Sequence, residues 1–163
     1  MLADLRLTPT GLRLGPHRWP CTVGRGGLTS AKREGDGATP RGTHRIVGMF
    51  WRPDRLPRPA PWAEPIRPGD LWCDDPRHPL YNHLARAPMT ASHERMRRAD
   101  RLYDLVLVTD WNWPEATPGA GSAIFLHRWR GPGRPTEGCI ALRSDHLLDF
   151  ARRLEPGTRL IVP

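Results

Sequence analysis

A cysteine and a histidine near the C-terminus have the types and the spacing for covalent catalysis. His127 ends the apolar segment Ser122 to His127 (SAIFLH), and Cys139 follows twelve residues later, after a loop rich in glycine and proline. A thiolate is a strong nucleophile, and a nearby imidazole can accept the thiol proton or stabilise the thiolate as an ion pair. A strand-loop-strand hairpin of this length predicts that the two side chains meet at one end of a sheet.

Gly138 directly precedes the candidate nucleophile. Because glycine leaves the backbone unobstructed, the amide N–H groups at and next to Cys139 are predicted to bind the oxyanion that forms when a carbonyl is attacked. Taken singly, Cys139 also fits a small buried hydrophobe, and His127 also fits an ordinary core or surface histidine. Their combination is what indicates a reaction.

These residues resemble the active site of the L,D-transpeptidase catalytic domain, also called the YkuD or ErfK/YbiS/YcfS/YnhG family. Its usual pattern is a histidine that ends a strand, a variable loop, and Ser/Thr-His-Gly-Cys followed by an apolar residue and Arg or Asn. GSAIFLH supplies His127, and TEGCIAL supplies Thr136, Gly138 and Cys139. The segment Lys32 to Ile46 (KREGDGATPRGTHRI) also resembles the family, so that the resemblance covers about Gly24 to Val162.

The sequence departs from the family pattern at two positions. Glu137 replaces the histidine before Gly-Cys, and Ala141 replaces the Arg or Asn two places after the cysteine. In the family these residues shape the donor site and bind substrate carboxylates, and Arg143 is the nearest substitute cation. Glu137 has three open roles: it recognises an ammonium such as that of diaminopimelate, it hydrogen-bonds within the site, or it is an exposed loop carboxylate.

The resemblance implies an enzyme that cross-links bacterial peptidoglycan and needs no cofactor. Cys139 would attack a carbonyl of a stem peptide and form a thioester, and the diaminopimelate amine of a second stem would then resolve it. His127 would carry the protons, with its second ring nitrogen held by a backbone carbonyl on the Arg128 side. The links would be 3-3, or 1-3 in a divergent branch, and the altered Glu137 and Ala141 keep the second option open.

The remaining site residues follow from the same resemblance. Tyr81, Asn82 and His93 resemble positions that line the cleft, and Trp129 lies on the loop between base and nucleophile, where it can cover the acyl-enzyme with Arg130. Carbapenem-type inhibitors are expected to react with such a thiol. No metal is expected, because His78, His83 and His93 lack a zinc-like spacing with a carboxylate or cysteine. The predicted substrate-binding set is Tyr81, Asn82, His93, Trp129, Thr136, Glu137 and Arg143.

Other functions stay open at this point. Water in place of the amine acceptor would make the protein an L,D-carboxypeptidase or an endopeptidase of cross-links. The net charge of +8 is also compatible with a protein that binds nucleic acid. The arginines are scattered from Arg6 to Arg159, however, and are not gathered on one element, so nucleic acid is not the expected partner. A wall-binding module without catalysis is the third alternative.

The predicted fold is mainly β with few helices, an L,D-transpeptidase-like β-sandwich or barrel in a single domain over residues 1–163. Short helices are expected at Ala91 to Ala99, capped by Ser92, and from Ser144, the expected N-cap, to about Leu154. Trp51 to Pro79 is expected to be a long ordered loop, because it is rich in proline while its tryptophans favour burial. The predicted strands are Ala3 to Leu7, Leu12 to Leu14 and Trp19 to Val23 as a meander, then Thr43 to Phe50, Leu102 to Thr109, Ser122 to His127, Gly138 to Leu142 and Thr158 to Val162.

The first twenty residues lack the apolar segment of a secretory signal, and no apolar stretch approaches the roughly 18 residues of a membrane span. The implied chemistry nevertheless places the enzyme in the periplasm or cell envelope. Cys21, Cys73 and Cys139 allow one disulfide in an oxidising compartment, whose connectivity the sequence does not determine.

Overall fold

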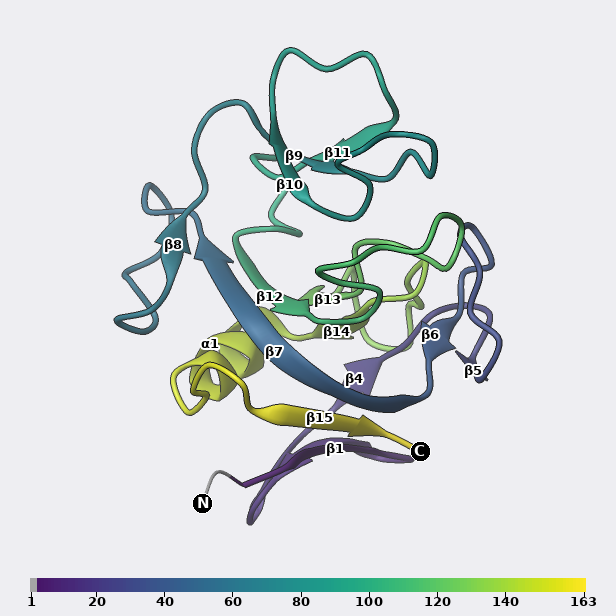
Figure 1. Ribbon diagram of the computed structural model, residues 1–163. Helices are drawn as coiled ribbons and strands as arrows, with labels where there is room; N and C mark the ends of the chain where they lie inside the picture. The colour runs from purple at the N-terminus through teal and green to yellow at the C-terminus, as the bar shows by residue number, and fades with distance from the viewer. Residues whose placement is uncertain (1–2) are drawn as a thin grey trace.

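The chain forms one large mixed sheet, a three-stranded sheet and a two-stranded pair in the computed structural model, which describes residues 3–163 (Figure 1). The large sheet has the order β3, β2, β1, β15, β7, β12, β13, β14, β4, and β8 pairs with β7. Its edge strands β3 and β4 are separated in the chain only by Pro20, so the sheet curls until its two edges are neighbours. The expected mainly β, barrel-like fold is therefore confirmed. The strands of this sheet are β1 (Leu5–Thr8), β2 (Gly11–Leu14), β3 (His17–Trp19), β4 (Cys21–Thr22), β7 (Gly42–Trp51), β8 (Glu64–Pro65), β12 (Leu105–Thr109), β13 (Phe125–Arg128), β14 (Ile140–Leu142) and β15 (Arg159–Val162).

The N-terminal strands form the predicted meander. β1, β2 and β3 pair antiparallel in sequence order, and Leu5, Leu7, Leu12 and Leu14 point into the core. The C-terminal strand β15 lies between β1 and β7, parallel to the first and antiparallel to the second. The first and last strands of the chain are thus neighbours in the large sheet, and β15 connects the N-terminal meander to β7.

β12 and β13 lie inside the large sheet, as their apolar composition predicts. All five residues of β12 are buried, and β13 pairs antiparallel with it. β13 begins three residues later than expected because Ala123 adopts a φ of +53°, outside the strand region. β14 pairs parallel to β13, so the predicted hairpin between His127 and Cys139 is wrong. The connection is a crossover loop.

Both helix predictions need correction. The helix α1 (Ser144–Ala151) has Arg143 at its N-cap position without a side-chain cap, so Ser144 is its first residue. The predicted helix from Ala91 to Ala99 is absent, and this segment contains strand β11 (His93–Arg95), which pairs antiparallel with β9. Long-range pairing therefore overrides a weak local helix signal.

The proline-rich segment Trp51 to Pro79 is mostly loop but also contributes strands. It includes β8 and β9 (Asp70–Cys73), and β9 is the central strand of the three-stranded sheet, between β10 (Leu84–Arg86) and β11. Trp51 and Trp72 are buried, which agrees with the expectation that its tryptophans pack. Figure 1 shows this small sheet stacked above the end of the large one, while β5 (Leu28–Thr29) and β6 (Thr39–Pro40) form the separate pair near the start of β7.

Candidate active site

Cys139 and His127 come from neighbouring parallel strands and project from the same face of the sheet. Leu126 pairs with Ile140 and His127 with Ala141, so Cys139, just before β14, lies level with Phe125. Side chains two residues apart on a strand share a face, which makes His127 and Cys139 diagonal neighbours. Both line a cavity of about 330 Å³. The two side chains thus border one cavity, and a parallel crossover instead of the predicted hairpin brings them there.

The ring of His127 is held in a defined orientation. Its Nδ1 lies 2.6 Å from the Arg128 carbonyl oxygen, the acceptor that the sequence predicts. A carbonyl can only accept a hydrogen bond, so Nδ1 carries the proton and Nε2 keeps its lone pair. The residue is 8% exposed. His127 is thus set as a proton acceptor through Nε2.

The thiol of Cys139 is held by the strand that carries the histidine, β13, and by the segment just before it. Sγ donates to the Ala123 carbonyl oxygen at 3.1 Å and accepts from the Phe125 amide at 3.4 Å. Within residues 3–163 no hydrogen bond joins Sγ to His127. Attack on a substrate therefore requires the thiol proton to turn from the Ala123 carbonyl towards the cavity.

The resting pair of Cys139 and His127 is neutral. Burial raises the pKa of the Cys139 thiol to about 12, and the negative charge of Glu94 acts in the same direction. Burial lowers the pKa of His127 to about 4, although the hydrogen bond to Arg128 opposes this shift. A preformed thiolate–imidazolium pair is therefore not the ground state, and the thiol must lose its proton during the reaction.

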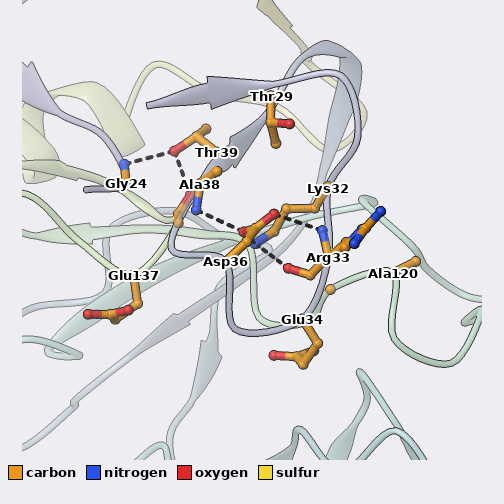
Figure 2. A network of polar contacts seen from close by, with 12 residues as sticks. Gly24, Thr29, Lys32, Arg33, Glu34, Asp36, Ala38, Thr39, Ala120 and Glu137 are labelled. Carbon is orange, nitrogen blue, oxygen red and sulfur yellow. Dashed lines mark hydrogen bonds and ion pairs between the residues drawn. The ribbon is translucent and has the colours of Figure 1, made fainter. Parts of the chain in front are cut away.

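A network of hydrogen bonds from the segment before β7 holds the backbone around the nucleophile (Figure 2). The Thr39 hydroxyl donates to the Gly138 carbonyl at 2.8 Å and accepts from the Gly24 amide at 2.9 Å. Gly138 has a φ of +140°, and a side chain there would meet the Ala38 carbonyl oxygen at 2.9 Å from its Cβ. Glycine is required at this position for both reasons.

Thr136 shapes the loop that leads to Cys139. Its hydroxyl donates to the Cys139 carbonyl at 2.5 Å and accepts from the Gly138 amide at 3.1 Å. The Gly138 amide is therefore engaged in this structure and is not a free donor for an oxyanion. Thr136 acts on the nucleophile through the backbone.

Glu137 and Arg143 form ion pairs away from the thiol. Glu137 borders the cavity, but its side chain is 80% exposed and accepts two hydrogen bonds from Arg25 Nε at 3.1 and 3.0 Å. The Arg143 guanidinium forms a bidentate pair with Asp145 at 2.6 and 2.8 Å and does not line the cavity. Arg143 therefore does not replace the missing family cation.

Asn82 is part of the framework that positions the thiol. Its Oδ1 accepts from Trp72 Nε1 at 3.0 Å and from the Ala123 amide at 2.9 Å, and its Nδ2 donates to the carbonyls of Trp111 and Asn112 at 3.0 and 2.7 Å. Because the Ala123 carbonyl in turn accepts from Cys139 Sγ, Asn82 supports the nucleophile without touching the cavity.

The other predicted cleft residues lie outside the cavity. Tyr81 is buried, donates to Glu34 and accepts from the Gly121 amide at 3.1 Å. His93 lines a separate cavity next to Asp70, and Trp129 lines a third one with Arg101 and Arg128. None of these three borders the space shared by His127 and the thiol.

Several residues that do border the cavity are not in the predicted set. They come from β11, from the turn before β12 and from the crossover loop, so only the tertiary fold brings them together: Glu94, Arg98, Leu102, Tyr103, Arg130, Arg134 and Pro135. Of these, Arg130 is the residue that the sequence predicts to cover the acyl-enzyme with Trp129, and Arg134 lies on the same loop between His127 and Cys139.

Among the described residues there is no group of three His, Cys, Asp or Glu side chains placed to bind a metal ion. Cys21, Cys73 and Cys139 are free thiols, so none forms the disulfide that the sequence left open. Across residues 3–163, no helix has the length and apolar character needed to cross a bilayer.

Comparison with known families identifies this architecture. The family model described as L,D-transpeptidase catalytic domain, YkuD, matches residues 14–162 and thus nearly the whole chain. A search of curated proteins found no match. The matched range includes β13, β14 and the crossover loop that place His127 and Cys139. The chain belongs to the YkuD family of L,D-transpeptidase catalytic domains.

Proposed function

We propose that this protein is a peptidoglycan L,D-transpeptidase that joins two stem peptides through a thioester on Cys139, and that residues 1–163 act as one catalytic domain. The observation that carries the proposal is the shared cavity, which exposes a thiol and an imidazole with a free Nε2 to the same substrate. Family membership supplies the class of substrate.

The first half-reaction forms the C–S bond, breaks the C–N bond and carries the thiol proton through His127 to the departing amine. Cys139 Sγ attacks the donor carbonyl as His127 Nε2 accepts the thiol proton, which gives a tetrahedral intermediate. Collapse of that intermediate breaks the C–N bond, and His127 returns the proton to the departing amine. The thioester remains on Cys139. Starting from a neutral pair, the imidazole takes the proton only as the C–S bond forms.

The second half-reaction reverses these roles. The side-chain amine of diaminopimelate on a second stem attacks the thioester while His127 Nε2 removes an amine proton. The C–S bond then breaks, and the proton returns to the sulfur. A new amide links the two stems and the enzyme is regenerated without any cofactor.

The charges around the cavity support a carboxylate-bearing substrate. Arg130 and Arg134 line the cavity and are exposed, and within residues 3–163 neither guanidinium forms an ion pair with a carboxylate. A guanidinium can bind a carboxylate through two parallel hydrogen bonds. These residues therefore suit the acidic groups of a stem peptide and take the place that Arg143 does not fill.

Incubation with purified muropeptides and separation of the products by mass tests the proposal. Dimers that Cys139→Ala does not form are the expected result, and fragmentation of the dimers distinguishes 3-3 from 1-3 links. If shortened monomers are the only products, the protein transfers the acyl group to water and is an L,D-carboxypeptidase or an endopeptidase instead. A cell-envelope location is part of the proposal, and a carbapenem adduct on Cys139 is expected.

A further inference from the structure

Glu94 is a carboxylate of the catalytic cavity without a cationic partner. It lies on β11 opposite Trp72, and Trp72 packs edge-on against Phe125, whose amide contacts the thiol. One oxygen of Glu94 accepts a hydrogen bond from the Tyr103 hydroxyl, and no ion pair to Glu94 is present within residues 3–163. Glu137, the other carboxylate at this cavity, is paired with Arg25. Of the two carboxylates that line the cavity, Glu94 is therefore the one that can bind a cation from a substrate.

The nearest arginine does not satisfy this need. Arg98 also lines the cavity, but its guanidinium forms two hydrogen bonds with Asp100 at 2.8 and 2.6 Å and stacks on the Tyr103 ring. Burial raises the pKa of Glu94, and the charges of Asp74 and Glu34 add to the effect, whereas the hydrogen bond from Tyr103 and the charge of Arg98 oppose it. A carboxylate in this position gains more from an incoming cation than an exposed one does.

The charge of Glu94 also bears on the nucleophile. It opposes ionisation of Cys139, as the second cause of the raised thiol pKa after burial. The Tyr103 hydroxyl keeps its proton, because burial and Glu94 raise its pKa well above the usual value, so it continues to donate to the carboxylate. A cation bound to Glu94 would offset this negative charge in the cavity that Cys139 also lines.

We propose that Glu94 binds an ammonium group of the substrate beside the scissile carbonyl, and that this bound cation makes Cys139 easier to deprotonate. This inference rests on the proposed acyl transfer, and it adds that the site recognises an ammonium group of the substrate. A peptide without the amine binds less well and also leaves the thiol in its resting, protonated state. Substrate recognition and activation of the nucleophile are thereby coupled through one side chain.

Binding is measured first, on the Cys139→Ala protein so that no reaction interferes. Titration calorimetry compares a diaminopimelate-containing stem peptide with the same peptide N-acetylated on its side-chain amine. We expect the free amine to bind about tenfold more tightly, and the preference to vanish in the double variant with Glu94→Gln. Glu115→Gln makes the same chemical change at an exposed position outside the cavity and is the matched control.

The effect on the thiol is measured without any peptide. Iodoacetamide is uncharged, and mass mapping separates Cys139 from Cys21 and Cys73. At pH 8 we expect Glu94→Gln to alkylate at Cys139 on the order of fivefold faster than the wild type, because the opposing charge is gone. The Glu115→Gln control should alkylate at the wild-type rate.

The outcomes separate this inference from the proposed function. If both peptides bind the Cys139→Ala protein equally well, Glu94 does not recognise the amine and the inference is overturned while acyl transfer stands. An unchanged alkylation rate in Glu94→Gln overturns the coupling to the thiol. If neither peptide binds and the wild type forms no thioester, the proposed function itself fails. The comparison of the two peptides does not depend on whether the Glu94 variant folds.

Discussion

Replacing Thr39 by valine removes one hydroxyl group and leaves the size of the side chain almost unchanged. The hydroxyl bridges two buried backbone groups, the Gly24 amide at 2.9 Å and the Gly138 carbonyl at 2.8 Å. No water can reach these groups without a change in structure, because Thr39 is only 1% exposed. The variant therefore leaves one donor and one acceptor unsatisfied.

The expected cost follows from these two groups. A buried polar group that loses its partner costs about 1–3 kcal/mol, so we expect the free energy of unfolding to fall by about 3 kcal/mol. For a chain of this size, that corresponds to a decrease in Tm of roughly 6–12 °C. Because the Gly138 carbonyl directly precedes Cys139, we also expect thiol modification by a carbapenem to slow by about tenfold.

Thr29→Val is the matched control, since Figure 2 places this threonine in the same segment. Within residues 3–163 its hydroxyl has a single hydrogen bond, accepted from the Ala31 amide at 3.0 Å in an exposed position, so the loss should stay below about 1 kcal/mol. Urea unfolding of both variants, with unchanged m-values, gives the comparison. Equal losses in the two variants, or an unaltered reaction rate in Thr39→Val, would refute the assigned role.

Three further predictions concern the same framework. Gly138→Ala places a Cβ 2.9 Å from the Ala38 carbonyl oxygen, so carbapenem labelling should slow by at least tenfold. Gly119→Ala is the control: its φ of +80° also disfavours a side chain, but no atom lies within 4 Å of the new Cβ, so labelling should keep the wild-type rate. Asn82→Asp replaces the donor Nδ2 by an oxygen that faces the Trp111 and Asn112 carbonyls. Urea unfolding should show a decrease in the free energy of unfolding of about 3 kcal/mol at pH 7. The decrease should be smaller at pH 4, because protonation of the new side chain removes its charge. With the pKa of Cys139 at about 12, the thiolate fraction grows as the pH rises, so alkylation of Cys139 should keep accelerating beyond pH 9, and a plateau near pH 6 would instead indicate an ion pair.

The strands that form the large sheet could be predicted because their signal is local. The segment LVLVT of β12 and the alternating leucines of β1 and β2 bury the side chains that their pattern indicates. The pairing of β13 with β14 was not predictable in the same way. A spacing of twelve residues suits a hairpin or an open crossover equally, and only the structure shows that β14 runs parallel to β13 and antiparallel to β4.

The candidate site was predictable only where its residues are close in sequence. His127, Thr136, Gly138 and Cys139 lie within one segment, so the residues themselves could be identified from the sequence, although the parallel pairing that arranges them could not. Glu94 was missed, because its segment has a weak helix pattern and becomes a strand only by pairing with β9.

Charge pairing over long separations was equally hidden from the sequence. The ion pair between Glu137 and Arg25 joins residues 112 positions apart, and no local pattern records it. The Asn82 contact with the Ala123 amide spans 41 positions in the same way. Such contacts decide which polar groups remain available to a substrate.

The most direct measurement of the central claim is the mass of the intact protein after brief incubation with a diaminopimelate-containing stem tetrapeptide and quenching in acid. Attack by Cys139 predicts a mass increase equal to the acyl fragment, mapped by proteolysis to Cys139, absent in Cys139→Ala and strongly reduced in His127→Ala. A product formed at full rate by the Cys139→Ala protein, or an acyl group mapped to Cys21 or Cys73, would contradict the account.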